Sequence, residues 1–291
     1  MQVIDIVIPY VNSNSKHYIY PFNDWHLGAK GCHEGKVNKL VAEVAEEPNA
    51  HVIGMGDIID AITMKDKRWD TAQVAKWVDK NNIVTSQEDK VIEIVTPVIG
   101  KIKSWGYGQH EDTVRKHYQQ NAHKNIIDKL NAKRKLMHTF LDFEDIPPIQ
   151  NAGFSCFLRI YFERENSRER HMFTGWCTHG STSAITKAGK TSALHRAASH
   201  READFHLYAH VHELDFKPDD YLCVRGRRGA GKIKSLKKPA ALCGSLLMTY
   251  TQGPEASYGE MRTYDPTSLG SIRVMLDPQH GKVRVEEVDL Q

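Results

Sequence analysis

A short apolar stretch that ends in a carboxylate and an imidazole constrains the fold of this chain more than any other feature. Residues 18–22, with the sequence YIYPF, predict a buried strand, and Asp24 and His26 follow it. Residues two apart on an extended backbone point to one side, so this D-x-H pair can bind a common ligand. A solvated loop can contain the same pair by chance, so the interpretation depends on similar patterns elsewhere in the chain.

The next segments repeat this pattern of an apolar run that ends in a polar ligand. Apolar residues at helical spacing predict a helix with one buried face, namely Val37, Leu40, Val41 and Val44. Residues 51–56 form a short apolar strand before Asp57, and Gly56 permits a tight turn there. Alternating strand and helix favour a largely parallel sheet, whose ligands bind beyond the carboxyl ends of the strands.

Residues from about 63 to 105 predict a mostly helical excursion. The capping-box pattern at residues 85–88, TSQE, predicts a helix start, followed by an apolar helical face from Val91 to Ile102. Pro97 predicts a kink or a restart of this helix. Packing of the helix on a sheet is the favoured interpretation, and a lid that shapes the substrate site is the alternative.

The remaining segments predict strands around a second set of polar residues. A glycine-rich stretch at 106–108 leads into a polar helical region that ends near residue 138. A hairpin is expected at 154–163 and 170–177, then a short helix containing Ala193 and Ala197, and a strand at 205–209. The last part of the chain predicts a run of antiparallel strands, around residues 221–224, 240–250, 271–276 and 283–288. No linker separates these parts, so we expect one domain over residues 1–291.

Composition excludes several classes of protein. The 291 residues can bury a full core, and a net charge of +3 is too small to argue for nucleic acid alone. Five cysteines without a C-x-x-C pair predict reduced thiols in a cytoplasmic protein. Because no signal-peptide pattern and no apolar run of about 20 residues occur, we expect no membrane association.

Six candidate ligands follow predicted strands across most of the chain. They are Asp24, His26, Asp57, His179, His210 and His212. A single histidine among the sixteen is more often a core or surface residue, but six such residues at successive strand ends predict a site. Carboxylate and imidazole ligands suit Mn, Fe or Zn, and the lack of a thiolate cluster disfavours a structural zinc site.

In this order the motifs resemble those of the calcineurin-like metallophosphoesterases, which include DNA-repair nucleases and purple acid phosphatases. That family has D-x-H, G-D-x-x-D, G-N-H-D/E, a lone H and G-H-x-H. The corresponding segments are Asp24-Trp25-His26, Gly56-Asp57-Ile58-Ile59-Asp60, Gly108-Gln109-His110-Glu111, Thr178-His179-Gly180 and Ala209-His210-Val211-His212. The resemblance covers about residues 18–250, and the surrounding chain is similar to phage-encoded and bacterial members without an assigned substrate.

The resemblance implies an α/β fold, a four-layer αββα sandwich of two mixed sheets flanked by helices, with two divalent metal ions. Manganese is favoured, with Fe, Zn, Ni, Co and Mg as alternatives. The first ion would be bound by Asp24, His26 and His212. The second would be bound by His179, His210 and Gln109, and Asp57 would bridge the two.

The implied reaction is phosphoester hydrolysis by a metal-bridged hydroxide, without a covalent enzyme intermediate. His110 would protonate the leaving oxygen or stabilise developing charge. Asp60 and Glu111 would hold the ligand residues in place without binding the ions. Two departures from the family pattern bear on this expectation. Gln109 stands where the family has Asn, and its extra methylene moves the amide oxygen outward unless the loop retreats. Ala209 replaces a motif glycine, which is a milder change.

Two basic segments are candidates for phosphate binding. Residues 225–238 form a glycine-punctuated basic turn, for which a phosphate contact and a solvated hairpin tip are equally favoured. Lys187, Lys190 and Arg196 follow His179 more closely and are the better candidates.

Three functions therefore remain open from the sequence. The first is a phosphodiesterase or nuclease acting on nucleic acid or a nucleotide, and the second is a phosphomonoesterase acting on nucleotides or phosphoproteins. The third is a catalytically silent binding protein, because Gln109 is compatible with a natural variant, a weakened enzyme or a substitution introduced to trap a complex. The oligomeric state is also open, with a homodimer among the alternatives.

Overall fold

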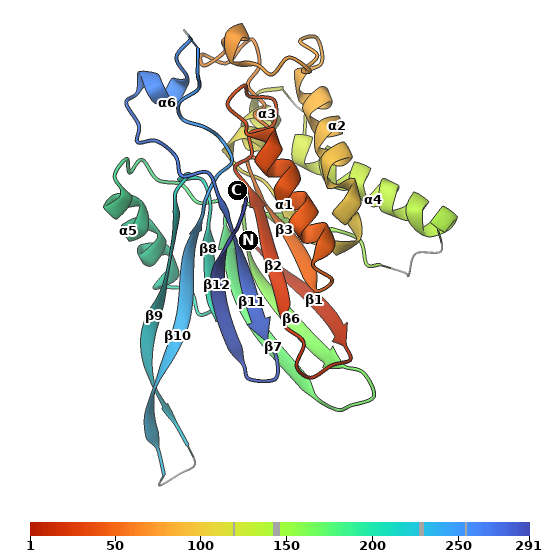
Figure 1. Ribbon diagram of the computed structural model, residues 1–291, viewed down its shortest axis with the longest axis vertical. Helices are drawn as coiled ribbons and strands as arrows, with labels where there is room; N and C mark the ends of the chain where they lie inside the picture. Colours follow the sequence, from red (N-terminus) through yellow and green to blue (C-terminus); the bar gives the residue numbers. More distant parts are fainter. Residues whose placement is uncertain (119, 142–145, 227–229, 254) are drawn as a thin grey trace.

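Two six-stranded mixed sheets pack face to face in the computed structural model (Figure 1), which describes residues 1–118, 120–141, 146–226, 230–253 and 255–291. The first sheet consists of β1 (Gln2–Tyr10), β6 (Ser155–Arg164), β7 (Arg170–Thr178), β8 (Phe205–Tyr208), β10 (Lys232–Cys243) and β9 (Leu214–Arg225), in that order. The second consists of β12 (Lys282–Val288), β11 (Ser271–Asp277), β2 (His17–Asn23), β3 (Ala50–Gly56), β4 (Ile102–Gly106) and β5 (Gln150–Gly153).

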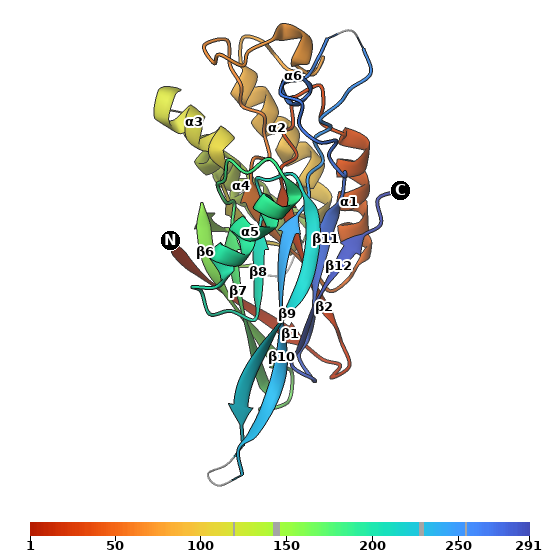
Figure 2. The same cartoon turned by 90° about the vertical axis from the view of Figure 1, so that its left-hand side faces the viewer.

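Helices cover the outer face of each sheet. The second sheet is covered by α1 (Glu34–Glu46), α2 (Ile83–Val95) and α4 (Ala122–Leu141), whose apolar faces share one core with β2, β3 and β4. The first sheet is covered by α5 (Lys187–Ala198), where Leu194 packs with Tyr208 and Leu242. The expected four-layer sandwich of two mixed sheets is therefore confirmed (Figures 1 and 2).

The core between the sheets explains why these segments are strands. Along β1 every second residue is buried, so Ile4, Ile6 and Ile8 face the other sheet while their neighbours face solvent. In β3, Ile53 and Met55 belong to the same core, whereas Val52 faces the helices. Strand β3 is buried on both faces, as is typical of a central parallel strand.

The parallel order of β2, β3 and β4 brings their carboxyl ends to one edge of the second sheet. Strands β7 and β8 are also parallel to each other, so their carboxyl ends lie together in the first sheet. The loops that follow these strands carry the candidate ligands. The topology therefore places sequence segments more than 180 residues apart side by side, as a contact between Asp24 and His210 demonstrates.

The predicted start of the second helix is wrong. Helix α2 begins at Ile83 after Asn82, so Thr85 lies inside the first turn and the capping-box pattern does not cap the helix. The Ser86 hydroxyl instead donates a hydrogen bond to the Ile83 carbonyl at 2.9 Å. Both Ile83 and Val84 are buried, so packing of these two apolar side chains favours the earlier start over the local capping pattern.

The predicted helical face also extends too far, because Ile102 belongs to strand β4. The α-helix ends at Val95, and a 3-10 helix, η2 (Thr96–Lys101), has Pro97 in its first turn, as the proline predicts. A short apolar run such as the one around Ile102 fits either a buried helix or a buried strand. In the structure this run forms a strand because it pairs with β3.

Other predicted elements are confirmed with adjusted bounds. The hairpin of β6 and β7 and the helix α5 form as expected, and the polar helical region consists of α3 (Gln109–Tyr118) and α4. The strand expected at 240–250 ends at Cys243, and β10 pairs with β9 along its whole length in a long antiparallel hairpin. Residues 227–229 in this hairpin lie outside the described residues. Two short elements complete the fold, η1 (Thr71–Gln73) and α6 (Tyr258–Met261).

None of the helices in the described ranges is long and apolar enough to cross a membrane.

Candidate metal centre

The six candidate ligands converge on the edge where strands of both sheets end. Asp24 and His26 follow β2, and Asp57 follows β3. His179 follows β7, while His210 and His212 follow β8. The structure groups them as Asp24, His26 and His212 on one side and Asp57, His179 and His210 on the other, with ligand atoms in each group within 4.8 Å of one another.

The backbone at this edge is strained at nearly every candidate ligand. Five residues adopt left-handed conformations, with φ angles of 48°, 49°, 49°, 71° and 50° at Asp24, His26, Asp57, His210 and His212 respectively. A non-glycine residue in this region costs about 1–3 kcal/mol and persists only where its surroundings impose it. This concentration of strain indicates that the loops are held for the direction of their side chains.

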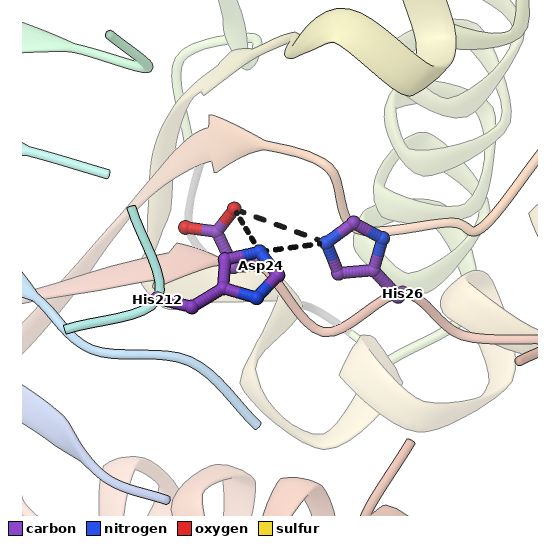
Figure 3. A group of neighbouring side chains, drawn as sticks. All are labelled: Asp24, His26 and His212. Atoms are coloured by element: carbon purple, nitrogen blue, oxygen red, sulfur yellow. Dashed lines mark hydrogen bonds and ion pairs between the residues drawn. The ribbon is translucent and has the colours of Figure 1, made fainter. Parts of the chain in front are cut away.

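The first group presents three ligand atoms at the spacing of a common cation (Figure 3). The Nε2 atoms of His26 and His212 lie 3.1 Å apart, and Oδ1 of Asp24 lies 3.4 Å from Nε2 of His212 and 4.0 Å from Nε2 of His26. Two atoms that bind one ion at about 2.1 Å are separated by roughly 3.0–3.4 Å. Two of the three spacings fall in this range, and the 4.0 Å spacing between Asp24 and His26 corresponds to a wider angle at a shared ion.

Asp24 is fixed by hydrogen bonds to only one of its oxygens. Its Oδ2 accepts from the backbone N–H of His210 at 2.8 Å and from the Asn23 amide at 2.8 Å, while buried Oδ1 has no partner among the described residues. Burial alone would raise the pKa of Asp24, but the imidazole of His212, 3.4 Å from Oδ1, and the charge of His179 lower it to about 2. The free oxygen is therefore anionic and points at the histidines.

The second group is oriented in the same way. Nδ1 of His179 donates to the Met55 carbonyl at 2.9 Å, so Nε2 faces the site, 3.1 Å from Oδ2 of Asp57. Burial would lower the pKa of His179, but the carboxylate of Asp57 raises it to about 9. A positive charge is thus favoured beside Asp57, and a bound cation would displace the imidazole proton.

Glu111 ties the loops of this group together. Its two buried oxygens accept hydrogen bonds from the backbone N–H groups of Asp57, Ile58, Ile59 and Gly108 at 2.9–3.3 Å. The backbone N–H of His110 also donates to Oδ1 of Asp57 at 2.8 Å. The loops after β3 and β4 are therefore locked to each other, which is the supporting role expected for Glu111.

Gln109 is the first residue of α3, and its amide has a defined orientation. The Nε2 group donates to the Gly180 carbonyl at 2.9 Å, which turns Oε1 away from that carbonyl. Oε1 is buried and has no hydrogen-bond partner within the described chain. The preceding Gly108 has space only for hydrogen at its Cα, because a Cβ would lie 2.2 Å from Oδ1 of Asp57 and 2.6 Å from Nε2 of His179.

A third group surrounds His110. Nδ1 of His110 makes a short hydrogen bond to the Asp60 carbonyl, and the Asp60 carboxylate lies 3.9 Å from both this atom and Nδ1 of His26. Burial raises the pKa of Asp60 to about 6. On the other side of the ring, Nη1 of Arg68 lies 3.4 Å from Nε2 of His110, and Arg68 also pairs with Asp66 at 2.8 Å.

Arg68 is the site residue that sequence reasoning missed. It lies between Thr63 and Asp70 in a turn-rich segment with no motif, and only the fold brings it to His110.

The basic candidates are placed differently. Lys187 and Lys190 both pair with Glu213, at 3.1 and 3.4 Å, next to His212 in the sequence. Arg196 lies in the last turn of α5, away from the amino end that follows His179.

The residues present fit divalent metal ions. Oε1 of Gln109 is buried without a hydrogen-bond partner among the described residues. Oδ1 of Asp24 and Nε2 of His179 are also buried, and their contacts are to other candidate ligands, at 3.4 Å to Nε2 of His212 and at 3.1 Å to Oδ2 of Asp57. Leaving such an atom unsatisfied costs about 1–3 kcal/mol, which coordination would remove. Carboxylate, imidazole and amide oxygen together suit Mn, Fe or Zn.

Comparisons with known proteins show only distant similarity. No protein-family model and no curated protein matches the chain. Vps29 from Entamoeba histolytica matches as a single mutant (TM-score 0.37, 10% identity, covering 94% of this chain and 99% of that chain). The same protein complexed with Zn²⁺ has a TM-score of 0.35 and 10% identity over 95% and 100% of the two chains.

A conserved uncharacterised protein from Streptococcus pneumoniae, described as a predicted phosphoesterase, has a TM-score of 0.32 and 13% identity over 94% and 98% of the two chains. These similarities are too low to assign a site or an activity. On its own motifs and its two-sheet architecture, the chain resembles the calcineurin-like metallophosphoesterases.

Proposed function

We propose that this protein is a binuclear metal-dependent phosphoesterase that acts on phosphodiester bonds of nucleic acid or of a nucleotide. The observation that carries the proposal is the pair of three-residue groups at one sheet edge, with five strained ligands. Left-handed residues of this kind cluster at functional sites, where the surrounding structure holds them in place. Manganese is the proposed metal, with the other divalent ions above as alternatives.

The first ion would be held by Asp24, His26 and His212, and the second by His179, His210 and the amide oxygen of Gln109. Asp57 would contribute to both. When bound, two such ions neutralise phosphate charge and acidify water. The protein supplies the buried, preorganised donors and keeps Asp24 ionised through its hydrogen bonds.

His110 is the proposed proton donor to the leaving oxygen. Burial disfavours its charge, but the carboxylates of Asp57 and Asp60 raise the pKa of His110. Its Nδ1 is held by the Asp60 carbonyl, so Nε2 is the atom that can give a proton to a substrate. In the free protein that atom lies 3.4 Å from Nη1 of Arg68, which can only donate, so Arg68 has to move away before Nε2 can give a proton.

The charges around the site favour a diester over a monoester. A phosphodiester carries one negative charge, whereas a monoester carries up to two near neutral pH. The nearby cations Lys187, Lys190 and Arg68 are already paired with Glu213 or Asp66. Few unpaired cations therefore remain near the site to balance the second negative charge of a monoester.

The proposal is tested by metal analysis together with hydrolysis of bis-p-nitrophenyl phosphate and p-nitrophenyl phosphate in Mn²⁺. We expect two metal ions per chain and faster hydrolysis of the diester, with both activity and metal content lost in Asp57→Asn. Hydrolysis of the monoester alone would replace the proposed function with a phosphomonoesterase.

Gln109 supports a second candidate, a binding protein without turnover. The Gln109→Asn variant separates the two functions, because it restores the motif amide. If the unmodified protein binds one metal ion and is inactive, while Gln109→Asn binds two and hydrolyses the diester, the unmodified protein is a disabled form of the hydrolase. Full metal occupancy with turnover in the unmodified protein would exclude the silent binding protein.

We further propose that residues 1–291 act as one domain in the cytoplasm. The buried thiols of Cys32, Cys156, Cys177 and Cys243 are unpaired, which suits a reducing compartment. A single cooperative unfolding transition and five titratable thiols after unfolding are the expected results.

A further inference from the structure

A basic site separate from the candidate metal centre lies on the outer face of the first sheet. It is a cavity of about 380 Å³ lined by residues from the carboxyl end of α5 and from the β9–β10 hairpin. The lining residues are Ala198, Ser199, His200, Arg201, Glu202, His206, Tyr221 and Lys238. Its volume is in the range of small-ligand sites.

The two cations of this cavity rest on aromatic rings. The guanidinium of Arg201 lies 4.5 Å from the ring centre of buried Trp176, and the ammonium of Lys238 lies 5.4 Å from that of Tyr221. Among the residues whose side chains are described, a set that leaves out 217–219 and 225 of β9, neither cation forms an ion pair with a carboxylate, in contrast to Arg68, Lys187 and Lys190. Arg201 donates one hydrogen bond to the Ala197 carbonyl at 2.5 Å, and its remaining N–H groups can bind an anion.

The cavity continues onto one face of the hairpin. Lys232, Lys234 and Lys238 are at alternating positions of β10, so their side chains lie on one face. Farther along the strand, the same face carries Ala240 and Leu242, which pack against α5. The basic face and the cavity thus form one continuous surface, and the hairpin extends it beyond the body of the protein (Figures 1 and 2).

This surface is within reach of the proposed metal centre. His206 lines the cavity at one end of β8, and His210 lies beyond the other end. Four residues of extended chain span at most about 14 Å. A nucleic acid strand covers this distance with about four nucleotides at the duplex rise of 3.4 Å, and with fewer when it is stretched.

We propose that this cavity and the basic face of β10 bind single-stranded nucleic acid, with an unpaired base on Tyr221 and adjacent phosphates on Arg201 and Lys238. Aromatic stacking combined with cations is how proteins hold unpaired strands without sequence preference. Tyr221 is 37% exposed, so its ring is accessible to a base. The inference deepens the proposed function, on which it rests for its link to catalysis, by assigning a polymeric substrate.

Binding is measured by fluorescence anisotropy of a fluorescein-labelled DNA oligonucleotide in EDTA, so that hydrolysis plays no part. We expect Tyr221→Ala to weaken binding about tenfold through lost stacking. Lys238→Gln should also weaken binding and reduce the slope of log affinity against log salt concentration by about one, because one phosphate contact is lost. Tyr221→Ala should leave that slope unchanged.

Glu202 provides the opposite control. It is the carboxylate among the lining residues, so Glu202→Gln should strengthen binding by removing repulsion of phosphate. A variant at the far edge of the first sheet, Arg159→Gln, removes a cation and should leave binding unaltered, since Arg159 pairs with Asp5 on β1. Unchanged circular dichroism and melting temperature establish that the variants fold.

The inference is overturned if Tyr221→Ala and Lys238→Gln bind the oligonucleotide like the unmodified protein, or if Arg159→Gln weakens binding as much as they do. Equal affinity for single strands and duplex would overturn the role of an unpaired base. These results are independent of turnover. Failure of the unmodified protein to hydrolyse the small diester would instead contradict the proposed function and leave binding at this cavity in place.

Discussion

The Nε2 atoms of His26 and His212 face each other at 3.1 Å, although the two residues are 186 positions apart in the sequence. One nitrogen must carry a proton for this contact to be favourable without a cation. With a metal ion between them, both nitrogens can donate their lone pairs. The contact thus joins the loop after β2 of one sheet to the loop after β8 of the other, and a bound cation would strengthen it.

Metal binding should therefore stabilise the whole fold. We expect the melting temperature to rise when Mn²⁺ is added to protein treated with EDTA, because a ligand at about 100 times its dissociation constant contributes about 2.7 kcal/mol. His212→Asn should lose much of this rise. His117→Asn, a change at an exposed position of α3, is the matched control. An equal rise in all three proteins would mean that the cation binds elsewhere.

A second prediction concerns Arg68 and the proton donor. The Arg68 guanidinium lowers the pKa of His110, so Arg68→Gln should move the alkaline limb of the pH profile of diester hydrolysis to higher pH. Asp66→Asn should move it the other way, because Arg68 loses its pairing carboxylate. The measurement is kcat/KM against pH for the three proteins. Coincident alkaline limbs would show that Arg68 does not act on His110.

The sequence predicted that the candidate ligands follow apolar strands, because that pattern is local, and metal binding by these residues stays a prediction. It did not predict Arg68, since only packing of a turn-rich segment brings that residue to His110. It also misassigned Ile102, because a short apolar run has no period that separates helix from strand. The sequence also could not predict the strained φ angles at Asp24 and Asp57, because no local preference of aspartate requires them.

At the opposite end of β2, buried His17 and half-buried His51 predict acid sensitivity. His17 stacks on His51 with ring centres 5.7 Å apart, and the neighbouring groups are Tyr10 and Phe162. Burial lowers the pKa of His17 to about 4 from an ordinary value of 6.5, and burial also lowers that of His51. The unfolded chain therefore binds protons first as the pH falls below 6.5.

The free energy of unfolding should accordingly decrease between pH 6.5 and 4, by up to about 3 kcal/mol from His17, and should not depend on this residue above that window. His17→Phe retains an aromatic ring beside Phe162 and removes the titration. Urea unfolding at a series of pH values should show a shallower decrease for this variant than for the unmodified protein. Parallel curves for the two proteins would contradict the prediction.

The last prediction uses Gly108 to test the second metal site by steric means alone. Gly108 is not among the glycines with positive φ, so alanine introduces no backbone strain there. Its Cβ would lie 2.2 Å from Oδ1 of Asp57 and 2.6 Å from Nε2 of His179, in the space that a cation shared by these atoms would need. Gly108→Ala should therefore reduce the metal content from two ions to one and abolish diester hydrolysis.

Gly35→Ala is the matched control, because its Cβ would meet only the His33 ring at 3.4 Å and helix α1 gains a better helix former. Elemental analysis after dialysis gives the metal content of both variants, and thermal unfolding reports their stability. Two bound ions in folded Gly108→Ala would show that the second cation does not lie between Asp57 and His179. A loss of one ion in Gly35→Ala as well would assign the effect to the fold in general, since that helix does not touch the second group.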